Sequence, residues 1–214
     1  MPRSGRRFID GLAYHVLNRA NRRATIFKSD GDYRSFFMAL ADGLDKVPVR
    51  VLGACAMPNH FHLVVWPEEG RAISAFMRWF MNAHIRRHHS FHQTWGTGHL
   101  YQGRFKAFPI QTGVHLLTVL RYVEANPLRA HLVDRAEQWR WSSLTLQALR
   151  DGRPVIAPSP VPRPANWREI VNTPLGMEAA EQMRACVRRN LPYGEDEWVR
   201  SVSEDPALRL DCPV

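Results

Sequence analysis

Two histidines, His60 and His62, lie in the stretch MPNHFHLVVW and are the side chains best placed to do chemistry. The apolar runs on either side of the first of them, residues 49–56 and 63–66, have the length and β-branched content of strands. Side chains alternate faces along a strand, so the two imidazoles point the same way and could place two nitrogens on one metal ion. Metal ligation needs a further partner. For an isolated pair, two hydrogen-bonded histidines at a strand edge are the simpler explanation.

A candidate partner lies sixty residues further along the chain. His115, Val119, Tyr122 and Asn126 recur at intervals of four, three and four, which places them on one face of a predicted helix. Pro127 disfavours helical geometry at the residue before it, so the helix is expected to end at Asn126. Taken alone, Tyr122 could be an amphipathic core tyrosine and Asn126 an ordinary residue at a helix C-terminus.

Taken together, these stretches resemble a known family. The sequences MPNHFHLVV, HLYQGRFKAFPI and RYVEANPLRAHLV are similar to those of REP-associated tyrosine transposases, which are HUH single-strand endonucleases with one tyrosine. The resemblance extends from about Tyr14 to Ser143. It implies an α+β, ferredoxin-like fold, an antiparallel sheet with helices on one face. It also implies that His60 and His62 hold a divalent metal, that Tyr122 is the nucleophile, and that Asn126 supplies a third, amide ligand.

The nature of the metal ion depends on which argument is followed. Imidazole ligands alone would suit zinc or manganese better than magnesium. The resemblance implies Mg²⁺ or Mn²⁺, and we adopt that expectation. Attack by a tyrosine on a phosphodiester needs no nucleotide cofactor, because the phosphotyrosine keeps the bond energy for rejoining.

The expected function is a metal-dependent endonuclease and transposase that cuts and rejoins single-stranded DNA at hairpin, REP-like sequences through a covalent phosphotyrosine. One alternative is a non-catalytic protein that binds DNA hairpins, although the intact set of His60, His62, Tyr122 and Asn126 argues against it. Another is a metal-dependent phosphohydrolase that uses water and forms no covalent intermediate.

The charge of the chain supports a polyanionic partner. With 29 basic and 20 acidic residues the net charge is +9, and arginine, whose guanidinium matches phosphate geometry, supplies most of it. The stretch 99–108 interleaves aromatic and cationic side chains, so it is either a platform for single-stranded DNA or an ordinary edge strand. The residues expected to contact DNA are Arg3, Arg6, Arg7, Arg19, Arg22, Arg23, Arg104, Lys106 and Arg129.

The chain divides into three predicted parts. Residues 1–150 form the catalytic domain, the proline-rich residues 151–165 a linker, and residues 166–214 a helical tail. The tail either contacts DNA, which its arginines favour, or braces the catalytic domain. The sequence contains no run of about 18 apolar residues, so it predicts no membrane span. Three scattered cysteines suit a reducing cytoplasm, where a DNA partner implies association with the nucleoid. The sequence leaves both a monomer and a homodimer open.

Helical periodicity predicts two further helices, residues 30–46 and 71–88, each with an apolar stripe that should pack on the sheet. His84 and His88, four residues apart on the second helix, could resemble a metal-binding pair. No thiolate or carboxylate lies at a suitable spacing, so we interpret them, with His89 and His92, as a solvated or phosphate-facing basic end.

Overall fold

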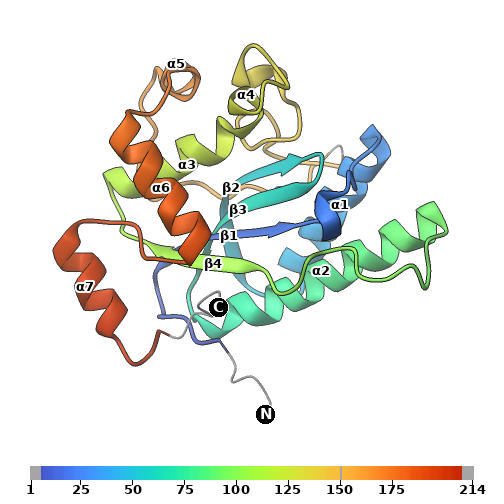
Figure 1. Ribbon diagram of the computed structural model, residues 1–214, viewed down its shortest axis with the longest axis horizontal. Helices are drawn as coiled ribbons and strands as arrows, with labels where there is room; N and C mark the ends of the chain where they lie inside the picture. Colours follow the sequence, from blue (N-terminus) through green and yellow to red (C-terminus); the bar gives the residue numbers. More distant parts are fainter. Residues whose placement is uncertain (1–5, 150, 209–214) are drawn as a thin grey trace.

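The computed structural model describes residues 6–149 and 151–208. Its centre is a four-stranded antiparallel sheet in the order β2-β3-β1-β4 (Figure 1). The strands are β1 (Ala13–Arg19), β2 (Val49–Met57), β3 (His60–Pro67) and β4 (Lys106–Ile110). The α-helices are α1 (Asp30–Leu44), α2 (Arg71–His92), α3 (Val114–Glu124), α4 (Asn126–Arg129), α5 (Trp167–Asn172), α6 (Met177–Arg189) and α7 (Asp196–Glu204). Two short 3₁₀ turns, η1 (Asn21–Arg23) and η2 (Ala136–Gln138), complete the elements.

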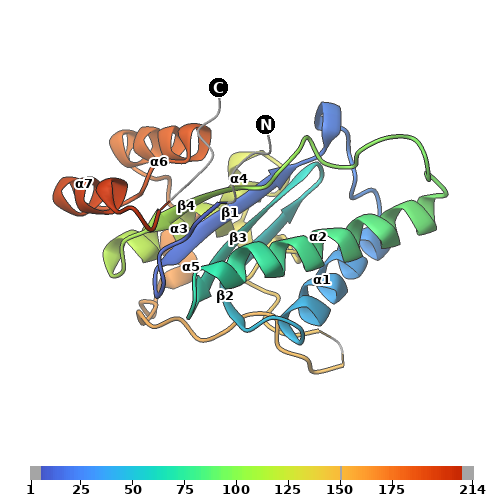
Figure 2. The same ribbon diagram turned by 90° about the horizontal axis from the view of Figure 1, so that it is seen from below.

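Apart from the short turn η1, the elements from β1 to β4 follow the order βαββαβ, which together with the strand order is the ferredoxin-like arrangement. The predicted α+β class and antiparallel sheet are therefore confirmed. The crossover helices α1 and α2 pack together on one face, over a core that includes Phe36, Phe61 and Phe80 (Figure 2). Ser29 caps α1 and forms a reciprocal capping box with Asp32, which fixes where this helix begins.

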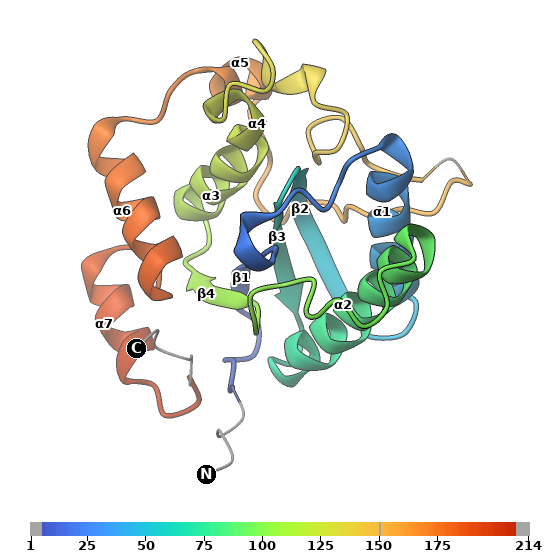
Figure 3. The same ribbon diagram turned by 45° about the vertical axis from the view of Figure 1, so that its right-hand side comes forward.

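Helices cover both faces of the sheet, whereas the sequence predicted cover on one face only. On the second face α3 lies across β2 and β3, opposite α1 and α2 (Figure 3). The reason is that alternate residues of β1, β2 and β3 are buried on this side as well, among them Ala13, Leu52 and Val64. A sheet with two apolar faces needs a layer on each. Gly53 allows the close approach of α3, because a Cβ there would lie 2.6 Å from Leu120.

The residues after α4 pack back on the sheet and pair with both of its edges. Along β2, the amide of Ala56 donates to the carbonyl of Trp141, and the amide of Ala157 donates to Val51. Along β4, Tyr193 exchanges backbone hydrogen bonds with Pro109 and Gln111. Pairing of this kind satisfies edge groups that would otherwise be open to other chains.

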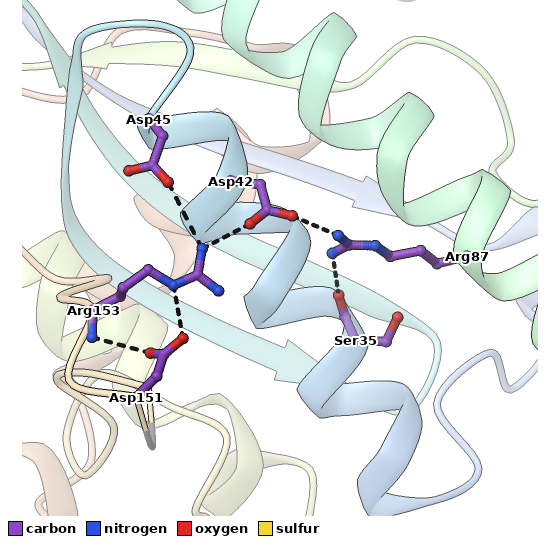
Figure 4. Close-up of polar contacts among 6 residues, drawn as sticks. All are labelled: Ser35, Asp42, Asp45, Arg87, Asp151 and Arg153. Atoms are coloured by element: carbon purple, nitrogen blue, oxygen red, sulfur yellow. Dashed lines mark hydrogen bonds and ion pairs between the residues drawn. The ribbon is translucent and has the colours of Figure 1, made fainter.

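The proline-rich segment, predicted as a linker, begins in an ion-pair network. Arg153 bonds Asp42 of α1 at 2.7 Å and Asp151 at 2.9 Å, and it lies 3.7 Å from Asp45. Arg87 of α2 bonds the same Asp42 from the other side (Figure 4). The network joins the segment to both crossover helices. Single surface ion pairs contribute less than about 1 kcal/mol each to the free energy of unfolding. We therefore assign the network to fixing the position of the segment.

The tail packs on the second face through side chains of the core. Trp167 of α5 and both Met183 and Cys186 of α6 are buried in the cluster that includes α3. Arg184 and Arg188 form ion pairs with Glu181 on the same helix. These contacts are those of a brace, and the DNA role of the tail stays a prediction. The predicted helical tail, residues 166–214, begins with the short helix α5 and continues with α6 from Met177.

Glu124, at the end of α3, holds the tail against the sheet. Its carboxylate is fully buried, accepts a hydrogen bond from Trp167 at 2.7 Å, and pairs with Arg163 at 3.0 Å. The hydroxyl of Ser143 also donates to it. Three segments distant in sequence thus meet at one carboxylate, two residues beyond Tyr122.

Replacing Glu124 with alanine is expected to lower the free energy of unfolding by about 3–5 kcal/mol, because it leaves Arg163 and the Trp167 indole without their buried partner. Urea denaturation of the purified protein measures the change. Glu68→Ala, which truncates an exposed glutamate, is the control and should stay within about 0.5 kcal/mol of the parent. Equal stability of both variants would contradict the assigned anchoring role.

Candidate metal and tyrosine site

The β2–β3 hairpin presents the two histidines at one end of the sheet. His60 begins β3 and pairs in register with Arg19 of β1, and His62 pairs with Leu17. The turn between the strands is held by a neighbouring loop, because the carbonyl of Pro58 accepts from the amides of Ile26 and Phe27. The alternation predicted from the sequence is confirmed, since both imidazoles lie on the face that α3 covers.

Each histidine of the pair has its Nδ1 engaged. Nδ1 of His60 lies 2.6 Å from Oδ1 of Asn59, and Nδ1 of His62 lies 2.9 Å from Nε2 of His15. The rings of His60 and His62 are 5.0 Å apart and nearly perpendicular. Because Nδ1 is occupied in both, Nε2 is the nitrogen that each ring has left for a ligand.

Both imidazoles are held neutral, which is the form that binds metal. Burial lowers the pKa of His60 to about 4, and the charge of Arg19 contributes further. Burial likewise lowers the pKa of His62 well below its ordinary value, assisted by the neighbouring rings of His15 and His60. Protons therefore do not compete for these two imidazoles near neutral pH.

Tyr122 lies beside His62 of the pair and beside His15 of β1. Its ring stands edge-on to His62 with 6.1 Å between ring centroids, and to His15 with 6.2 Å. Only 5% of the residue is exposed, and the guanidinium of Arg129 lies over the ring at 4.3 Å. The hydroxyl has no hydrogen bond to any of the described residues. The structure thus brings together the tyrosine and histidines that the sequence singled out.

Asn126 occupies the first position of α4, one turn beyond Tyr122, and is buried. Its side-chain nitrogen donates to the carbonyl of Tyr122 at 2.9 Å and to that of Val123 at 3.4 Å. The amide therefore caps the end of α3, which is the structural role considered from the sequence. Because both bonds use the nitrogen, the side-chain oxygen is the atom left for a ligand.

The side chains around the histidine pair offer a limited donor set for a metal ion. Within residues 6–149 and 151–208, no three side chains from histidine, cysteine, aspartate and glutamate are arranged to hold one. Two neutral imidazoles and one amide oxygen nevertheless suit a divalent ion such as Mn²⁺ better than Mg²⁺, and such an ion would take its further ligands from phosphate and water. The residues therefore fit a weakly held divalent ion.

The predicted DNA contacts fall into two groups. Arg19 and Arg129 lie close enough to the pair to affect the pKa of His62. Arg22 and Arg23 lie on η1, exposed, with left-handed φ angles of 52° and 57°. Asn59 ties this turn to the histidine hairpin by donating to the carbonyl of Arg23. Such φ angles are costly for arginine and often occur at functional sites.

The remaining predicted contacts lie elsewhere. Arg6 stacks on Phe105 at 4.6 Å and donates to its carbonyl, Lys106 donates to the carbonyl of Arg188, and Arg7 and Arg104 are exposed. Arg3 is outside the described residues. The stretch 99–108 contributes the start of edge strand β4, and the rings of Tyr101 and Phe105 are buried, so they are not an exposed stacking platform.

The histidines at the end of α2 are not the solvated basic end that the sequence predicted. His84 is buried and shares a hydrogen bond of 2.9 Å with the hydroxyl of Tyr101, and His92 pairs with Asp32 at 2.6 Å. Sequence reasoning also missed His15 and Glu124. Only the even spacing of His15 from Arg19 along β1, which puts both on one strand face, could have indicated the first of them.

Fold and site together define a ferredoxin-like protein in which a histidine pair from a central strand meets a tyrosine from a helix on the same face. A family model described as "Transposase IS200 like" matches residues 8–126, more than half of the chain. The chain belongs to this family of transposases. The matched span includes His60, His62, Tyr122 and Asn126.

One solved structure shares the fold, and a second matches less of it. The structure of a REP-associated tyrosine transposase bound to a REP hairpin is 18% identical, with a TM-score of 0.56, and the match covers 74% of this chain and 92% of that one. A candidate transposase from Deinococcus radiodurans R1 is 21% identical over 57% of this chain and 95% of its own, with a TM-score of 0.41. No curated protein matches the sequence. Among the described residues, none of the helices is both long and apolar enough to cross a membrane.

Proposed function

We propose that this transposase is a metal-dependent endonuclease that cuts and rejoins single-stranded DNA at hairpin, REP-like sequences through a covalent phosphotyrosine. One observation carries the proposal: the ring of Tyr122 stands edge-on to His62, 6.1 Å away, although the two residues come from different elements sixty positions apart. Packing alone does not require a tyrosine beside two neutral, partly engaged imidazoles. This arrangement is the one expected if the tyrosine is a nucleophile beside a cation site.

Nε2 of His60, Nε2 of His62 and the side-chain oxygen of Asn126 are the atoms proposed to hold Mg²⁺ or Mn²⁺. When bound, such an ion supplies Lewis-acid stabilisation of the charge that develops on the scissile phosphate. Neither histidine needs to lose a proton first, because burial keeps both rings neutral. The roles of these residues rest on their chemistry and on their place in the fold, with the side-chain nitrogen of Asn126 capping the end of α3 and its oxygen left for a ligand.

The hydroxyl oxygen of Tyr122 is the proposed nucleophile. It forms a bond to the phosphorus as the bond from phosphorus to the 3′ oxygen breaks, the phenolic proton leaves, and the departing oxygen gains a proton to become a 3′ hydroxyl. Tyrosine is a weak nucleophile at its ordinary pKa of about 10 and needs positioning. Arg129, stacked over the ring, holds it and places positive charge near the reacting oxygen.

Hairpin DNA is the proposed partner, and a DNA substrate would place the protein with the nucleoid in the cytoplasm. The solved relative bound to a REP hairpin supports this choice of substrate class. The net charge of +9 and the exposed turn with Arg22 and Arg23 beside the histidine hairpin support it further.

The deciding experiment mixes the protein with a hairpin-bearing single strand, labelled at its 3′ end, and Mn²⁺, followed by a denaturing gel. The label belongs at the 3′ end because the tyrosine would retain the 5′ phosphate of the downstream fragment. A labelled band that migrates with the protein supports the proposal. Free labelled product without an adduct would favour a water-using phosphohydrolase, and uncut DNA that nevertheless binds would favour a non-catalytic hairpin protein.

Arg129→Ala is expected to weaken hairpin binding and to reduce the slope of log affinity against log salt by about one, because one phosphate contact is lost. Fluorescence anisotropy across a salt series measures both quantities. Arg50→Ala is the matched control, since Arg50 also lies over an aromatic ring, that of Trp66. This pair lies at the end of the β2–β3 strand pair opposite to His60. Identical slopes for the parent and Arg129→Ala would contradict the contact.

A further inference from the structure

His15 is a buried histidine outside the predicted set. It lies on β1, is fully buried, and places Nε2 2.9 Å from Nδ1 of His62. The two rings are nearly parallel, 14° apart in orientation, with centroids separated by 5.0 Å. The arrangement is therefore a directed hydrogen bond between two imidazoles.

The other nitrogen of His15, Nδ1, has no hydrogen-bond partner among the described residues. Its surroundings are aromatic, with the ring of Phe108 at 4.9 Å and that of Tyr122 at 6.2 Å. Leaving a buried polar group unsatisfied costs about 1–3 kcal/mol, and native proteins keep few such groups. An apolar residue would pack here without that cost, so the imidazole is retained for what its Nε2 does.

Only one of the two facing nitrogens can carry the shared proton. If His15 donated from Nε2, neutral His62 would carry its own proton on Nε2 and could not bind a metal through that atom. If His62 donates from Nδ1, its Nε2 lone pair is free. His60 shows the same pattern, because its Nδ1 faces the side-chain oxygen of Asn59, which only accepts.

We propose that His15 is a positioning residue that accepts a hydrogen bond from Nδ1–H of His62 and so fixes the tautomer and ring orientation in which Nε2 of His62 binds the metal. This inference rests on the metal role proposed above. Partners that orient a ligating histidine through its second nitrogen commonly change metal affinity by about 10–100-fold when removed.

The first test reads the tautomer directly in metal-free, full-length protein. Long-range ¹H–¹⁵N correlation spectra distinguish protonated from bare ring nitrogens. We expect protons on Nδ1 of both His62 and His15, and bare Nε2 atoms on both. A proton on Nε2 of His62 would overturn the proposal. Because no variant is required, this test does not depend on a substitution that disturbs folding.

The second test measures Mn²⁺ affinity by electron paramagnetic resonance, without DNA. His15→Phe removes the acceptor and should weaken binding about 10–100-fold. His15→Gln, whose side-chain oxygen can accept, should recover much of the affinity. His84→Phe is the control, because it removes a buried histidine hydrogen bond on the other face of the sheet. Equal affinities for the phenylalanine and glutamine variants at position 15 would assign His15 to packing alone.

The two proposals can fail separately. If His60→Ala binds Mn²⁺ as tightly as the parent, the metal role of the pair is wrong, and the purpose given to His15 is wrong with it. If His60→Ala loses Mn²⁺ while His15→Phe does not, the metal role stands and the positioning role is overturned. The loss of affinity in both variants, with recovery in His15→Gln, supports both.

Discussion

Replacing Tyr122 with phenylalanine is expected to abolish the covalent protein–DNA adduct while leaving hairpin binding nearly unchanged. Removal of a catalytic nucleophile typically lowers kcat by about 10⁶-fold, which puts the adduct below detection on a gel. The fold should tolerate the change, because the Tyr122 hydroxyl bonds none of the described residues and the phenyl ring still lies beneath Arg129. Gel analysis of the 3′-labelled strand, with anisotropy for binding, measures the two effects.

The control for this variant is Tyr101→Phe. Tyr101 is also buried in the matched span, but its hydroxyl bonds His84 in the core between the sheet and the crossover helices. That variant should lose a little stability and keep adduct formation. Adducts that persisted in Tyr122→Phe and vanished in Tyr101→Phe would reassign the nucleophile and remove the observation on which the proposed function depends.

Local periodicity accounts for the part of the site that the sequence predicted. His60 and His62 share a strand face because strand side chains alternate, and Tyr122 stands one turn before Asn126 because the helical period is 3.6 residues. Both relations hold within a few residues of chain. The helix was expected to end at Asn126, before Pro127, and it ends two residues earlier, at Glu124. A new short helix, α4, begins at Asn126 with the proline in its first turn.

The rest of the site depends on contacts between distant segments. His15 meets His62 across 47 positions, and a single histidine in an apolar strand carries no local pattern that indicates its partner. Glu124 is an acidic residue at a helix end, which normally predicts exposure. Its burial follows from Arg163 and Trp167, about forty residues later. His84 was likewise predicted to be solvated, and only the hydroxyl of Tyr101 explains how it can be buried.

His60→Ala should remove metal-dependent cleavage with little loss of stability. Its ring is partly exposed and contacts chiefly Asn59 and His62, whereas truncating the fully buried His62 would also leave a cavity. We expect Mn²⁺ affinity to fall by at least about 100-fold. Removing a residue that only orients a metal ligand already lowers metal affinity by about 10–100-fold. Titration of Mn²⁺ followed by electron paramagnetic resonance measures the loss of metal affinity, and the cleavage gel measures the loss of cleavage independently.

His131→Asn is the control, because His131 is exposed and asparagine tolerates its left-handed φ of 54°. Cutting by His60→Ala that continued undiminished without metal would reject the ligand role.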